Sequence, residues 1–170
     1  MILKIKSVLY LIAMCIAVAF TSCGVYSFTG AAIEGKTINV HFIDNASRNI
    51  VPSLSATFTE KLRQRILSQS SLSQLNSDKT DYDISGTITN YEVTVASISG
   101  SETSVKNRLT IGVTIQFKNA LNEKANFEQT FTRFADFDAN KNLQSIETTL
   151  INDITSQLAD DIFNKAFVNW

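Results

Sequence analysis

The 170-residue chain has little cysteine, proline or histidine and almost no excess of one charge. Two cysteines and one histidine exclude zinc and iron–sulfur sites, which need these ligands in clusters. One proline and six glycines exclude collagen-like and linker-dominated chains. A formal net charge of −1 gives no overall attraction to the phosphates of nucleic acid. Hydrophobic residues are plentiful, at 44% of the sequence, so one domain with a substantial core is expected.

The first 22 residues have the layout of a secretory signal. Lys4 and Lys6 precede an unbroken apolar run from residue 8 to residue 20, and small polar residues follow it. This run is too short for a transmembrane helix, which needs about 20 apolar residues. We therefore expect a signal peptide rather than a retained membrane span.

The signal ends at a cysteine in a motif that resembles the bacterial lipobox. Residues 20–24 read Phe-Thr-Ser-Cys-Gly, in which Ser22 and Cys23 match the pattern and the two preceding residues depart from it. The resemblance implies that Cys23 becomes the acylated N-terminus, and more than one acyl chain makes membrane attachment stable. An ordinary signal with an incidental cysteine is the alternative. Because Cys15 lies in the removed segment, no internal disulfide is expected after cleavage.

The resulting organisation is a signal peptide at 1–22, an acylated leader at 23–35 and a single domain at 36–170. Within the domain, the β-branched run 37–43 predicts a first strand. A proline at the first turn predicts a helix over 52–70, with four apolar residues spaced at i+4 on one face: Leu54, Phe58, Leu62 and Ile66.

The second half of the domain predicts three strands and a long helix. Apolar residues alternate over 82–95, with a change of phase at Asn90 that indicates a β-bulge, and again over 109–117 and 127–137. An amphipathic pattern over 143–167 predicts the last helix. The fold class is therefore α/β (α+β): a two-layer sandwich with one four-stranded, mostly antiparallel sheet and two helices on one face.

The other face of the predicted sheet is hydrophilic and rich in threonine. It is either a face exposed to solvent, as is common for antiparallel sheets, or a face that docks in a polar cavity, and the pattern favours neither. Its members alternate with the apolar residues of the last two strands: Arg108, Thr110, Gly112, Thr114, Gln116, Lys118, Glu128, Thr130 and Thr132.

The sequence contains only weak catalytic and metal-binding patterns. We therefore expect that the protein is not an enzyme, binds no metal and carries no cofactor other than the covalent lipid on Cys23. His41 stands alone, without a cysteine nucleophile. Residues 136–147 place oxygens from Asp136 to Glu147 at the spacing of a calcium loop, but Lys141 occupies the position that requires glycine. The structural alternative is that these polar residues form a turn and the start of the last helix.

Basic side chains at the ends of the predicted hairpins are the remaining candidates for ligand binding. Lys106 and Arg108 lie at one end of the sheet, and Lys118 and Lys124 lie at the other. Arginine and lysine both suit phosphate, the first as a fork and the second as a point charge. The alternative for each residue is a contribution to solubility alone.

Several segments together resemble the lipopolysaccharide-assembly lipoproteins (LptE-like): 23–30, 54–60, 107–110, 126–137 and 160–166. This resemblance implies an α/β sandwich and a non-enzymatic protein at the periplasmic face of the outer membrane. It further implies a β-barrel partner at this membrane. The chain would plug this barrel and help it to assemble lipopolysaccharide. The four basic residues are our own candidates for contacts with lipopolysaccharide phosphates. The alternative function is a free periplasmic lipoprotein that binds a glycolipid or glycan without a barrel.

Overall fold

The computed structural model describes residues 33–96 and 105–168. The expected signal peptide and the acylation site Cys23 lie outside the described residues. No helix in the described ranges is long and apolar enough to cross a membrane.

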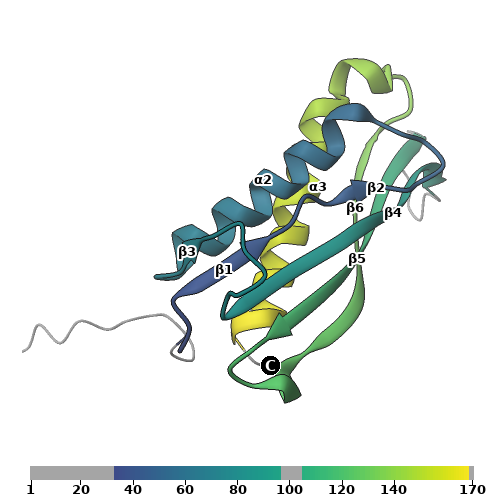
Figure 1. Cartoon of the computed structure of the whole chain (residues 1–170). Helices are drawn as coiled ribbons and strands as arrows, with labels where there is room; N and C mark the ends of the chain where they lie inside the picture. The colour runs from purple at the N-terminus through teal and green to yellow at the C-terminus, as the bar shows by residue number, and fades with distance from the viewer. Residues whose placement is uncertain (1–32, 97–104, 169–170) are drawn as a thin grey trace, which may run out of the picture.

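One sheet of six strands forms the framework of the domain, in the order β3-β1-β4-β5-β6, with β2 paired to β4 (Figure 1). The three long strands at its centre and edge are antiparallel, whereas the three short strands pair in parallel. The strands are β1 (Thr37–Val40), β2 (Asp44–Asn45), β3 (Ser73–Gln74), β4 (Tyr82–Ala96), β5 (Lys106–Asn119) and β6 (Phe127–Asp138).

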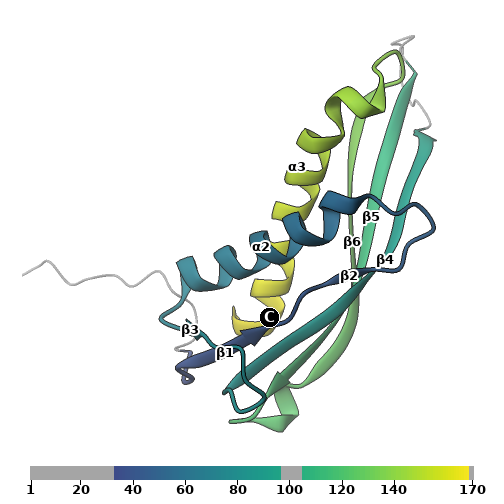
Figure 2. The same ribbon diagram turned by 45° about the horizontal axis from the view of Figure 1, so that its top comes forward.

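Two long helices cover one face of this sheet, and Figure 2 shows them together on the same side. Helix α2 (Pro52–Gln69) begins with its proline in the first turn, as the sequence predicts. Helix α3 (Leu143–Phe163) continues into a π-helical turn, η2 (Asn164–Val168). A short 3₁₀ helix, η1 (Glu123–Ala125), joins β5 to β6. The predicted two-layer α/β sandwich is confirmed.

The sheet differs from the prediction in its number of strands and in the length of the first one. Strands β2 and β3 are additional, and β1 ends at Val40 rather than at Ile43. The chain leaves the ladder because the backbone N–H of Ile43 donates to Oγ1 of Thr59 on α2 at 3.0 Å. This hydrogen bond to the helix layer replaces a bond within the sheet.

The core lies between the two helices and the inner face of the sheet. The predicted apolar face of α2 is fully buried, and so is Phe117 of β5. At one end, the rings of Tyr82, Phe117, Phe127 and Phe167 pack against one another with centroid separations of 5.3–5.9 Å. This aromatic cluster joins β4, β5, β6 and η2, and therefore fixes the end of α3 against the sheet.

The predicted β-bulge is confirmed between Ile88 and Asn90, where the register of β4 against β5 shifts. After the bulge the phase of β4 reverses, so Tyr91 points to the helix layer. Its hydroxyl donates to Oε1 of Glu147 on α3 at 2.6 Å. Burial of the ring raises the pKa of Tyr91 above its ordinary value, and the carboxylate adds to the effect. The bulge thus places a polar link between the two layers.

Candidate functional site

The face of the sheet opposite the helices is the first candidate surface, and we call it the open face. Its polar character is confirmed, and its side chains pair across strands. Thr114 and Thr130 share a hydrogen bond of 2.9 Å, and Gln116 donates to Glu128 at 2.8 Å. Such pairs on adjacent strands stabilise a sheet and leave a flat hydrophilic wall.

One of the predicted phosphate ligands, Arg108, is already held by neighbours on β6. Its Nε and Nη2 atoms donate to the two carboxylate oxygens of Asp136 at 2.7 and 2.9 Å. Its guanidinium also lies 3.6 Å from the ring centre of Phe134. The hydrogen bonds from Arg108 lower the pKa of Asp136 and raise the pKa of the guanidinium itself. A phosphate at this position would therefore have to displace a carboxylate.

The four predicted basic residues do not form one cluster. Lys106 and Arg108 project from the start of β5, and Lys106 is opposite Asp138 in the register. Lys118 lies at the other end of β5, and Lys124 lies in η1 beyond it. The structure therefore offers two separate cationic ends, and contact of any of these residues with lipid stays a prediction.

Sequence reasoning missed a polar cluster where β1 meets β4 on the open face. His41 Nε2 lies 2.7 Å from an Asp83 oxygen, and the Asn39 amide lies within 3.1 Å of the same histidine nitrogen. Asp81 accepts hydrogen bonds from the backbone N–H groups of Lys36 and Thr37, and these bonds lower the pKa of its carboxyl. The Asp81 contacts join the start of β1 to the start of β4, and the His41–Asp83 contact joins the two segments just past the end of β1.

Residues of the calcium-loop pattern make the contacts that its structural alternative describes. Asn142 caps the N-terminus of α3 by accepting from the backbone N–H of Gln144. Asp136 is held by Arg108 on the open face, whereas Glu147 bonds to Tyr91 on the helix side of the sheet. Within 33–96 and 105–168, no three His, Cys, Asp or Glu residues form a group that could hold a metal ion.

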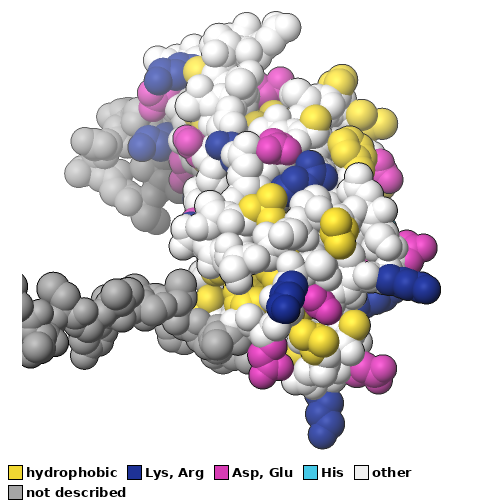
Figure 3. All heavy atoms as spheres, turned by 60° about the vertical axis from the view of Figure 1, so that its left-hand side comes forward, with side chains coloured by type: hydrophobic (Ala, Val, Ile, Leu, Met, Phe, Trp, Pro, Cys, Tyr) yellow, Lys and Arg dark blue, Asp and Glu magenta, His cyan; other side chains and the backbone are white. Residues whose placement is uncertain are grey.

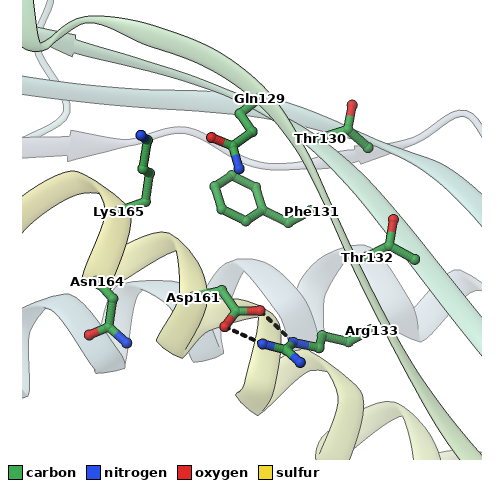
Figure 4. A pocket seen from close by; sticks show the side chains of 8 residues that line it. All are labelled: Gln129, Thr130, Phe131, Thr132, Arg133, Asp161, Asn164 and Lys165. Atoms are coloured by element: carbon green, nitrogen blue, oxygen red, sulfur yellow. Dashed lines mark hydrogen bonds and ion pairs between the residues drawn. The ribbon is translucent and has the colours of Figure 1, made fainter. Parts of the chain in front are cut away.

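A second surface, which the sequence did not reveal, is a groove of about 490 Å³ between β6 and the end of α3. We call it the edge groove. Gln129, Phe131 and Arg133 point from β6 toward the helix, whereas Thr130 and Thr132 point away from it (Figure 4). Its helix side is lined by Asp161, Asn164 and Lys165.

Charge in the edge groove is arranged unevenly. The two carboxylate oxygens of Asp161 accept from Arg133 Nε and Nη2, the latter at 2.6 Å, and these bonds raise the pKa of the guanidinium. Lys165 lies 5.7 Å from the ring centre of Phe127 and forms no ion pair with any described residue. The groove therefore has a neutralised end and a cationic end.

The family of the protein follows from comparison with known proteins. The family model described as LptE, lipopolysaccharide-assembly, matches residues 35–166, which include the whole described sheet and both helices. The chain belongs to the LptE family. LptE-family membership identifies it as a lipopolysaccharide-assembly lipoprotein of the cell envelope, and the family is non-enzymatic. No curated protein sequence matches the chain significantly.

Three solved structures show similarity to this LptE-family chain at low sequence identity. The hypothetical protein CT253 from Chlamydia trachomatis has a TM-score of 0.53 at 10% identity, over 79% of this chain and 98% of that one. A minor lipoprotein from Acinetobacter baumannii has a TM-score of 0.45 at 14% identity, with 79% and 94% covered. Lipoprotein B from Nitrosomonas europaea has a TM-score of 0.46 at 17% identity, with 78% and 83% covered. The likeness to CT253 shows a shared fold.

Proposed function

We propose that this LptE-family protein is anchored in the outer membrane through lipid on Cys23 and plugs a β-barrel partner from the periplasmic side. The open face of the sheet lies against the polar wall of the barrel lumen, and the complex assembles lipopolysaccharide in the outer leaflet. The chain contributes shape and hydrogen-bonding groups rather than catalysis.

The observation that carries this proposal is the chemistry of the open face. Within the described part of the chain, no layer covers this face, and its threonines and amides pair with one another across strands. A large apolar side chain on it, Phe134, is capped by the guanidinium of Arg108. The lumen of an outer-membrane barrel is itself polar, so a flat polar wall complements it.

On the face in Figure 3, hydrophobic side chains form small separate patches among acidic and basic ones. Scattered apolar side chains of this kind are ordinary on soluble surfaces and do not mark an interface.

Gentle detergent extraction of the tagged, acylated protein tests the proposal, with mass spectrometry of the proteins that co-purify. We expect one large β-barrel protein at equal stoichiometry. Thr130→Trp places a bulky ring on the open face and should reduce the recovered barrel, whereas Thr148→Trp, on an exposed position of α3, should not. A monomer that carries only lipid would overturn the proposal in favour of a free glycolipid-binding lipoprotein.

The same preparation tests the lipid contacts. Alanine at Lys106 and Arg108, or at Lys118 and Lys124, should each lower the amount of bound lipopolysaccharide. Two pairs are used because the structure separates the cationic ends of β5. Unchanged lipopolysaccharide in both pairs would remove these residues as phosphate ligands.

A further inference from the structure

Strand β6 forms an edge of the sheet and is unusually open to pairing. It is 12 residues long, and in the described ranges it pairs with β5 alone. Its register against β5 is continuous from Phe127 to Asp138, without a bulge or a proline. An edge strand of this length presents a row of backbone N–H and C=O groups that another strand can bind.

The edge groove gives this strand the geometry of a peptide-binding site. Side chains alternate along β6, so Phe131 turns toward the helix and its flanking threonines turn to the open face (Figure 4). The helix side of the groove is contributed by Asp161, Asn164 and Lys165. An extended peptide that adds to an edge strand beside a helix receives its affinity from main-chain hydrogen bonds and its specificity from alternate side-chain positions.

The chemistry of the groove defines the ligand. Phe131 is 7% exposed and provides an apolar floor, which suits a small apolar side chain. Arg133 is neutralised by Asp161, whereas Lys165 makes no ion pair among residues that the structure describes. A carboxylate near Lys165 would supply the missing opposite charge.

We propose that the edge groove binds an extended segment of a partner protein as an additional strand beside β6, with an acidic side chain next to Lys165. This inference goes beyond the proposed function, because it concerns the edge of the sheet rather than its open face. The chain's own leader is a poorer occupant, since its one acidic side chain, Glu34, lies three residues before β1, and β4 and β5 separate β1 from β6.

The test is a photo-crosslinking walk along β6 in the full-length, acylated protein in its native membrane. A benzophenone amino acid replaces Gln129 or Arg133 in turn, both of them exposed and both directed from β6 into the edge groove. A matched control places it at Thr114 of β5, which is flanked by strands on both sides. Mass spectrometry then maps the crosslinked position on the partner.

A partner strand beside β6 has a specific signature. The shift of four residues from Gln129 to Arg133 should move the crosslink by four residues in one extended segment of the partner, and the Thr114 control should lack this pattern. Lys165→Glu should lower the crosslink yield by about two- to five-fold, the range expected from an exposed charge pair, whereas Lys79→Glu, at an exposed position between β3 and β4, should leave it unchanged.

Several results would overturn the inference. Absence of crosslinks from β6, crosslinks without the four-residue step, or crosslinks to residues 23–32 or to a second copy would each do so. An unchanged yield in Lys165→Glu would overturn the acidic ligand. A barrel that co-purifies while β6 stays silent would refute this inference alone. A stepped crosslink to another protein, with no barrel recovered, would support it and refute the proposed function alone.

Discussion

Replacement of Gly86 by alanine should destabilise the domain through a close contact inside the sheet. A Cβ atom at Gly86 would lie 2.5 Å from the backbone oxygen of Thr114 and 2.7 Å from Cδ1 of Ile115 on the neighbouring strand. The side chain of Ile115 can move, but the Thr114 carbonyl belongs to a strand paired on both sides. The two strands must therefore separate locally.

The expected loss of stability in Gly86→Ala is the difference between two opposing effects. Overpacking in a well-packed core costs about 1–3 kcal/mol, and loss of unfolded-state entropy on replacing glycine by alanine returns about 0.4–1 kcal/mol. Because the contact at Gly86 involves backbone, we expect the upper part of this range, a net loss of about 2 kcal/mol. For a domain of this size the melting temperature should fall by roughly 6–10 °C.

A matched variant in the same sheet provides the control. At Gly112, an added Cβ atom would lie 3.2 Å from the side chain of Asn90 and 3.5 Å from that of Thr132, contacts that small shifts can relieve. Gly112→Ala should therefore change the free energy of unfolding by less than about 0.5 kcal/mol. Urea unfolding of both variants of the domain measures this difference. Equal stabilities of the two variants would refute the packing argument.

Three further predictions concern polar groups. Tyr91→Phe removes the hydrogen bond to Glu147 between the layers and should lower the free energy of unfolding by about 1–2 kcal/mol in urea titrations; a loss near zero would mean that the bond is not formed in solution. Arg108 lowers the pKa of Asp136 in the folded state. The ionised carboxylate therefore makes its full contribution to the free energy of unfolding above about pH 4, and this contribution is lost as the pH falls through the lowered pKa of the folded state. The urea midpoint of the wild type should therefore approach that of Asp136→Asn as the pH falls from 5 to about 2, and parallel curves would contradict this sign. If Cys23 carries the proposed acyl chains, Cys23→Ser should move the protein from the detergent phase to the aqueous phase in a phase-separation assay, and a variant that stays in the detergent phase would contradict the proposed anchor.

The two helices and three long strands could be predicted because their patterns are long and regular. In α2, apolar residues at i+4 spacing follow a proline at the first turn, and all of that face is buried. In β4, the change of apolar phase after Ile88 marks the bulge directly in the sequence. These features are set by local periodicity, so one sequence suffices to find them.

The features that sequence reasoning missed depend on contacts between distant residues. Strands β2 and β3 have two residues each, which is too short to show any alternation. The shortening of β1 depends on Thr59, which lies in the helix layer. The neutralisation of Arg108 depends on the register that places Asp136 opposite it. That register could have been predicted from the sequence, because the short connection between β5 and β6, once assigned, determines which residues of the two strands lie opposite one another.

The length of β5 sets a limit on how its two cationic ends can act. Arg108 and Lys118 share one face of this strand and are ten residues apart, which corresponds to roughly 34 Å at about 3.4 Å per residue. This span slightly exceeds the thickness of the hydrocarbon core of a bilayer, about 30 Å. One lipid headgroup therefore cannot bridge both ends, and substitutions at the two ends should have additive effects. If β5 lies parallel to the axis of a barrel partner, its two ends would therefore lie near the two opposite interfaces of the membrane.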